Sequence, residues 1–175
     1  CARYVRGATP TLAHNYYNNG DGTITDTDTG LMWAQVPGSA MNWNAALSYA
    51  EGLTTAGYTD WRLPNVRELQ SLVDITLCTA TTSASAKAAL NRKLFSTATA
   101  TAYWSSTPVA GGSLTSAWLV EFGINSTVPA ANGPSRGFQG IVSYELQTST
   151  YPVFAVRTAG AGACDCRTTS TATAW

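Results

Sequence analysis

The sequence predicts an α+β fold in which two helices pack on a small, mostly antiparallel sheet with long loops. Two segments place apolar residues at helical spacing, and several short runs alternate apolar and polar residues as strands do. Gly, Asn and Asp residues separate these segments, as turns require. A chain of 175 residues is long enough for one domain with a proper core.

The first strands are expected in the stretch "NNGDGTITDTDTGLMWAQ". It contains an Asn-Gly and an Asp-Gly step, then alternating residues and an apolar run, which is the pattern of a β-hairpin. We expect short strands near residues 22–26 and 30–35.

A first helix follows and is expected to cover the sheet. Its apolar residues recur at helical spacing, and the helix should end before Gly57. These residues are Ala45, Ala46, Tyr49, Ala50 and Leu53.

A second helix is predicted within "GYTDWRLPNVRELQSLVD". Pro64 stops any earlier helix, and Asn65 with Glu68 three residues later forms a capping-box pattern. The buried stripe of this helix should comprise Val66, Leu69, Leu72 and Val73.

The second half of the chain is predicted to supply the remaining strands. Residues 76–101 are rich in Ala, Thr and Ser, which indicates a surface excursion pinned by Cys78 and by Leu94 and Phe95. Four strand-like runs follow: "AYWSSTPV", "SAWLVEFG", "GIVSYELQT" and "YPVFAVRT". In the second run, Trp118, Val120 and Phe122 alternate with Leu119 and Glu121.

The charge composition argues against two classes of partner. Charged residues make up 11% of the chain, and ten basic residues balance ten acidic ones. Nucleic acids and anionic membranes attract clustered positive charge, so neither is expected as a partner. The longest apolar runs are far shorter than the roughly 20 residues of a membrane-spanning helix, so membrane insertion is not expected.

The four cysteines are disulfide candidates in an exported protein. Their spacing fits no zinc module and no C-x-x-C redox motif, and three pairings are possible. A bridge between the last two is sterically awkward, so each is expected to pair with one of the others. The four are Cys1, Cys78, Cys164 and Cys166.

Several linked motifs resemble a known bacterial family. "NNGDGTITDTDTGLMW", "WNAALSYAEGLTTAGYTDWRLPNVRELQSLVD", "YWSSTPV", "AWLVEF" and "FAVRT" are similar, in this order, to the C-terminal domain of the Legionella collagen-like adhesin. The resemblance covers residues 16–158 and implies a C-type-lectin-like fold, related to that of the formylglycine-generating sulfatase-modifying enzymes. It leaves residues 1–15 as an N-terminal extension and 159–175 as a tail of linker composition.

One departure from that family concerns its cysteines. Members often carry one Cys in the first helix and one in the closing strand, where this chain has "LSYAEGL" and "FAVRT". Both are absent together, as expected if they normally pair. The cysteines of this chain must therefore join other segments.

The aromatic motif residues are expected to be structural rather than catalytic. Trp61 and Leu63 should fill the core, and Arg62 should hydrogen-bond turn carbonyls. A catalytic role for Arg62 is not expected, because no residue of catalytic type is near it in the sequence. Three further tryptophans receive structural roles: Trp33, Trp104 and Trp118.

No enzymatic activity is expected. A serine hydrolase needs a base, and the single histidine, His14, precedes the domain. No pair of acidic residues stands out for glycosidase chemistry.

A metal site is a minority hypothesis, and no cofactor is expected. Asp21, Asp26 and Asp28 are clustered oxygen donors of the kind that calcium prefers. The residue order of an EF-hand loop is missing, however, and local turns explain these aspartates better.

Ligand binding is expected in the loops of the C-terminal half. Residues 108–116 and 123–151 are rich in Asn, Ser, Gly and Tyr, the composition of adaptable binding loops. The resemblance implies the same half, because related lectin-like folds carry their ligand face there. The candidates are Ser113, Asn125, which also begins an N-S-T sequon, Asn132, Arg136 and Tyr144.

Two functional hypotheses follow. In the first, the chain is a non-catalytic recognition module, secreted or on a bacterial cell surface, that binds carbohydrate or a surface or matrix protein. In the second, it is a structural subunit of a homo-oligomeric surface fibre assembled through its tails. The N-terminal "RYVRGATP" echoes the closing "FAVRTAGA", so it could add to the sheet of a neighbouring copy.

Overall fold

The computed structural model describes residues 15–74, 90, 94–98, 102–110, 115–122 and 141–160. Within them the chain forms nine short strands, two α-helices and one 3-10 turn. In order these are β1 (Tyr16–Asn18), β2 (Thr23–Asp26), β3 (Leu31–Ala34), β4 (Gly38–Met41), α1 (Trp43–Glu51), the 3-10 turn (Thr55–Gly57), α2 (Val66–Ser71), β5 (Ala102–Pro108), β6 (Ser116–Glu121), β7 (Ile141–Leu146), β8 (Tyr151–Val153) and β9 (Val156–Thr158).

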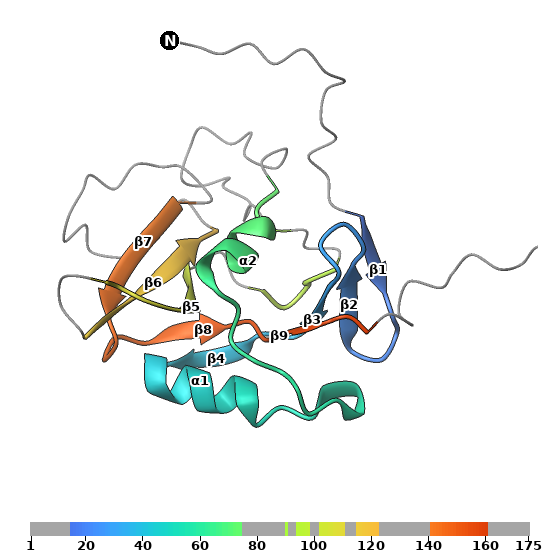
Figure 1. The fold of residues 1–175 in the computed structure, drawn as a ribbon, viewed down its shortest axis with the longest axis horizontal. Coiled ribbons are helices and arrows are strands. Elements are labelled where there is room, and N and C mark those ends of the chain that lie inside the picture. The colour runs from blue at the N-terminus through green and yellow to red at the C-terminus, as the bar shows by residue number, and fades with distance from the viewer. Residues whose placement is uncertain are drawn as a thin grey trace, which may run out of the picture.

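The described strands form three small antiparallel sheets rather than one. Their orders are β1-β2-β3-β9, β4-β8 and β5-β6-β7. Figure 1 shows α2 between the first and third sheets, with α1 beneath the β4-β8 pair. The predicted α+β class is confirmed, and the arrangement is C-type-lectin-like.

The N-terminal hairpin has one more strand than the sequence predicted. Strands β2 and β3 lie where they were expected, and β1 pairs with β2 across the Asn-Gly and Asp-Gly steps. Gly20 and Gly22 have φ of 79° and 87°, conformations that favour glycine. Because β1 has only three residues, its sequence carries no alternation that could reveal it.

Helix α1 is shorter than the sequence predicted. It ends at Glu51, because the backbone N–H of Gly52 turns back to the carbonyls of Ser48 and Ala50, so Leu53 lies beyond its end. Ala45, which was assigned to the apolar stripe, is exposed. The buried face consists of Ala46 and Ala50.

Helix α2 begins with the predicted capping box, which is confirmed. The Asn65 side chain accepts hydrogen bonds from the backbone N–H groups of Arg67 and Glu68, and Glu68 accepts one from the Asn65 backbone. In the predicted stripe Leu69 and Leu72 are buried, while Val66 and Val73 are partly buried.

Two clusters of buried side chains make up the core. The first contains Trp33, Leu69 and Val120, and the second contains Ala46, Trp104 and Leu119. Adjacent residues of β6 therefore face different clusters, and both faces of this strand are covered. The alternation along the strand does not separate a core face from a solvent face.

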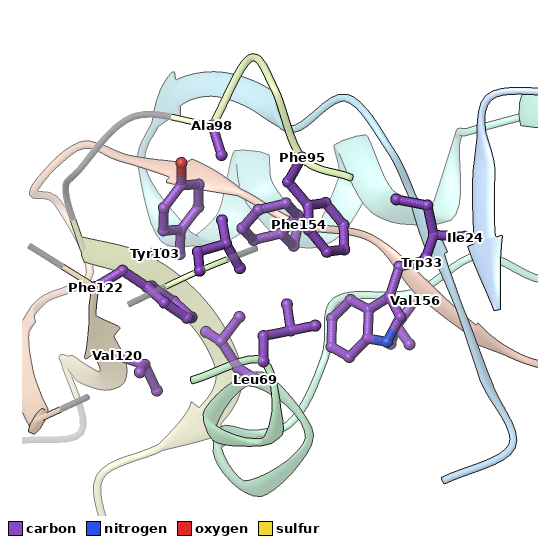
Figure 2. Packing of buried hydrophobic residues seen from close by; sticks show 12 residues of the cluster. Ile24, Trp33, Leu69, Phe95, Ala98, Tyr103, Val120, Phe122, Phe154 and Val156 are labelled. Carbon is purple, nitrogen blue, oxygen red and sulfur yellow. The ribbon is translucent and has the colours of Figure 1, made fainter. Parts of the chain in front are cut away.

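The segment 94–98 is joined to the first cluster, as expected for Leu94 and Phe95. Phe95 is buried and meets Phe154 edge to face, with ring centroids 5.4 Å apart. Figure 2 shows this segment above Phe154, with Tyr103 beside it. Tyr103 stacks on Phe154 at 4.5 Å. The other expected anchor, Cys78, lies outside the described residues.

The C-terminal run closes two of the sheets. Strand β8 pairs with β4, and β9 pairs with β3 at the edge of the first sheet. The run between residues 151 and 158 thus divides into two strands that enter different sheets.

Candidate functional site

Most of the predicted ligand candidates lie outside the described residues: Ser113, Asn125, Asn132 and Arg136. The same holds for all four cysteines and for His14. Tyr144 is described. It lies in the middle of β7, partly buried, opposite Trp118 of β6.

The "DWRLP" motif is structural, but the expected partner of Arg62 was wrong. Trp61 and Leu63 are buried in the second cluster, as predicted. The Arg62 guanidinium donates to both oxygens of the Glu68 carboxylate, at 2.8 and 2.7 Å, instead of to turn carbonyls. These charge-assisted bonds lower the pKa of the Glu68 carboxyl. The Arg62 backbone N–H and C=O pair with Val156 of β9, at 2.9 Å each.

The other predicted structural tryptophans lie in different environments. Trp33 and Trp104 are fully buried, one in each cluster. Trp104 donates its indole N–H to the Met41 carbonyl at 3.0 Å. Trp118 is only partly buried and meets Tyr144 edge to face, with ring centroids 5.4 Å apart.

The aspartates considered for calcium belong to local turns. Asp21 accepts hydrogen bonds from the backbone and hydroxyl of Thr23, at 3.0 and 2.6 Å. Asp26 accepts from the backbone N–H of Asp28, whose own carboxylate accepts from the Asn15 backbone. Among the described residues, no group of three His, Cys, Asp or Glu side chains could hold a metal ion.

A cleft lies where the start of α1 meets the end of β7. Its volume is about 380 Å³, within the range typical of small-molecule sites. The described lining residues carry amide and hydroxyl groups and one leucine, and none of them is charged. The lining residues are Asn42, Asn44, Thr115, Leu146, Gln147 and Thr148.

Backbone hydrogen bonds hold the cleft walls in place. The N–H of Trp43, the first residue of α1, donates to the Gln147 carbonyl at 2.9 Å. The Gln147 N–H donates in turn to the Thr115 carbonyl, just before β6, at 2.6 Å. The Trp43 indole donates to the carbonyl of Ser105 in β5 at 2.8 Å. These bonds join the start of α1 to β5, to the start of β6 and to the end of β7 around one opening.

Apolar side chains continue from the cleft along the third sheet. Leu146 is 51% exposed and pairs with Ser116, and two residues along the same two strands Trp118 pairs with Tyr144. Side chains alternate along a strand, so Tyr144 and Leu146 lie on the same face of β7. The predicted candidate Tyr144 is therefore next to the residue that forms the apolar wall.

Four of the six described lining residues of the cleft fall within the predicted loop ranges, and two do not. Thr115, Leu146, Gln147 and Thr148 fall within the loop ranges expected to bind ligand, whereas Asn42 and Asn44 come from the N-terminal half. Asn42 caps α1 through a hydrogen bond from the Ala45 N–H at 2.9 Å. Asparagine one residue before a predicted helix is a cap signal, which would have marked this position.

Neither helix in the described part of the chain is long and apolar enough to cross a bilayer. No curated protein matches the chain. The family model of the Lcl C-terminal domain matches residues 22–157, a span that includes every cleft residue.

Proposed function

Since the chain belongs to the Lcl C-terminal domain family, we propose that it is a non-catalytic adhesion module that binds a glycan or a matrix protein through its C-terminal loops, together with the start of α1. The family indicates a module related to bacterial surface adhesins, located at the cell surface or outside the cell. The finer statement, which concerns the ligand, is the proposal.

The observation that carries this proposal is the preformed cleft between α1 and the end of β7. Its polar walls are held by backbone hydrogen bonds to Thr115 and Gln147, so little ordering is needed when a ligand enters. Uncharged amides and hydroxyls suit recognition by hydrogen bonding.

The absence of catalysis is part of the proposal and is supported by the environment of Ser105 in β5. Ser105 is buried, and its hydroxyl donates to the Trp118 carbonyl at 2.7 Å. A hydroxyl oriented toward a backbone carbonyl in a sheet is not an activated nucleophile. The only histidine of the chain precedes the described residues.

The proposal is tested by measuring adhesion directly. The full chain, immobilised on beads, is exposed to a panel of glycans and to purified matrix proteins, and retention is compared with that on beads carrying heat-unfolded chain. We expect saturable binding that requires the folded chain. Equal retention by folded and unfolded chain across the panel would contradict the proposal.

The fibre-subunit hypothesis stays a prediction. It depends on the N-terminal extension and the C-terminal tail, nearly all of which lie outside the described residues. Light scattering of the full chain tests it, because assembly through tails makes the apparent mass rise with concentration, whereas a constant monomer mass excludes it.

A further inference from the structure

We propose that Asn19, in the turn between β1 and β2, is a site of spontaneous deamidation that the native fold shields, and that conversion there releases β1 from the first sheet. Asn19 is followed by Gly20, and this Asn-Gly step lies between the end of β1 and the start of β2. A chemical modification of this turn is independent of the proposed adhesion function.

Deamidation of Asn19 proceeds through the backbone nitrogen of Gly20. This nitrogen gives its proton to hydroxide and attacks the Cγ atom of Asn19, which closes a five-membered ring. The Cγ–Nδ2 bond breaks, the amide nitrogen takes up a proton and leaves as ammonia, and a succinimide remains. Water then opens the ring at either carbonyl and leaves aspartate or isoaspartate at position 19. Glycine favours the attack because it has no side chain to hinder the approach.

Hydrogen bonds engage both reacting groups in the folded chain. The Gly20 N–H donates to Oδ1 of Asn18 at 2.9 Å, so the proton that must be lost is held by a side chain. The Asn19 side-chain amide donates to the hydroxyls of Thr23 and Thr25, at 2.7 and 3.0 Å. Both threonines are fully buried, so water does not compete for these acceptors. The turn therefore has to open before the nitrogen can attack.

Opening of this turn is resisted by the strands that it joins. The Asn19 N–H donates to the Thr23 carbonyl at 3.1 Å and closes the turn. The adjoining residues, Asn18 and Ile24, pair across β1 and β2. Ile24 is fully buried in the first cluster, so β2 is fixed to the core and the shielded geometry persists for as long as β1 stays paired.

Conversion at position 19 removes the bonds that hold the end of β1. A carboxylate has no N–H to donate, so the hydroxyls of Thr23 and Thr25 lose their donor. The new charge also lies near the Asp21 carboxylate, which accepts a hydrogen bond from the same Thr23 hydroxyl at 2.6 Å. Isoaspartate lengthens the backbone by one carbon, which displaces Asn18 from its position opposite Ile24. Strand β1 has three residues and pairs with β2 alone among the described strands, so it is released.

The test follows deamidation of the full chain by peptide mass spectrometry, with isoaspartate detected by isoaspartyl methyltransferase labelling. Folded chain is incubated beside chain unfolded in urea and reductant, where Asn132, the other Asn-Gly step of the sequence, gives a reference rate. Asn18→Ala removes the acceptor of the Gly20 N–H, and Thr25→Val removes one acceptor of the Asn19 amide. The matched control is Thr29→Val, at an exposed threonine in the next turn. Circular dichroism verifies that each variant is folded.

We expect Asn19 to react at the rate of Asn132 in the unfolded chain and at least about tenfold more slowly in the folded chain. Loss of one hydrogen bond raises the population of the open turn about three- to tenfold. Asn18→Ala and Thr25→Val should therefore deamidate faster than wild type by this factor, and Thr29→Val should react at the wild-type rate.

Release of β1 is measured by amide hydrogen exchange, which should be faster in residues 16–18 of the converted chain than in the intact chain. Equal rates at Asn19 in folded and unfolded chain, or no reaction there in the unfolded chain, overturn the proposal. It is also overturned if Asn18→Ala and Thr25→Val react no faster than Thr29→Val, or if conversion leaves the exchange of β1 unchanged.

Discussion

The substitution Gly38→Ala should destabilise the protein through a single clash between β4 and α1. A Cβ atom at Gly38 would lie 2.6 Å from Cε1 and 2.7 Å from Cζ of Tyr49. Favourable carbon contacts lie at about 3.5–4.0 Å, so the overlap is close to 1 Å. Strand β4 is held by its pairing with β8, so the partly buried Tyr49 ring has to move rather than the strand. Overpacking of this kind costs about 2 kcal/mol, which for a chain of this size lowers Tm by roughly 4–8 °C.

Urea unfolding and calorimetry measure this cost. The control is Gly160→Ala, because a Cβ there meets nothing within 4 Å and the glycine does not have positive φ. In a Tyr49→Ala background the clash is absent, so Gly38→Ala should then change the free energy of unfolding by only a few tenths of a kcal/mol. The reasoning is refuted if Gly38→Ala is as stable as Gly160→Ala, or if its cost is the same with and without the Tyr49 ring.

Three further predictions concern stability. Phe95→Ala should cost about 3–5 kcal/mol in urea unfolding, because the buried ring anchors its segment to the core; a cost below 1 kcal/mol would mean that the segment is not anchored. Asn65→Ala should lower the stability by about 1 kcal/mol in thermal unfolding, because α2 loses its N-cap. Asn65→Asp retains the capping oxygen and should not show this loss. Hydrogen bonds from Arg62 lower the pKa of the Glu68 carboxyl. The stability that this ion pair contributes is therefore complete above the unfolded-state pKa of about 4.3, and it is lost as pH falls through the lower folded-state pKa. The stability difference between wild type and Glu68→Gln should therefore shrink as pH falls below about 4, and a pH-independent difference would contradict the assignment.

The sequence predicted those elements whose signals are local. The capping box of α2 involves residues three positions apart, and the hairpin glycines define turns within a few residues. Such patterns act before any distant contact forms, so they can be recognised in the sequence alone.

The sequence failed where the three-dimensional arrangement of side chains or layers decides the outcome. Both oxygens of the Glu68 carboxylate accept hydrogen bonds from the Arg62 guanidinium. The spacing of the two residues along the chain did not reveal this pairing. Ala45 has the right periodicity for the apolar stripe, yet it is exposed because it faces away from the sheets that α1 covers. The strand register of β6 places Leu119 and Val120 in different clusters, because layers pack on both of its faces.

The residue pattern alone was enough to predict the fold class and the family resemblance, and it pointed to the C-terminal loops as the place to seek a ligand. It did so because caps, turns and apolar periodicity depend on neighbouring residues. That Asn42 and Asn44 line the same cleft as Leu146 and Thr148 follows from the packing of distant segments and could not be read from the residue pattern. These pairs are about a hundred residues apart in the printed sequence, and they meet because the N–H of Trp43 binds the carbonyl of Gln147.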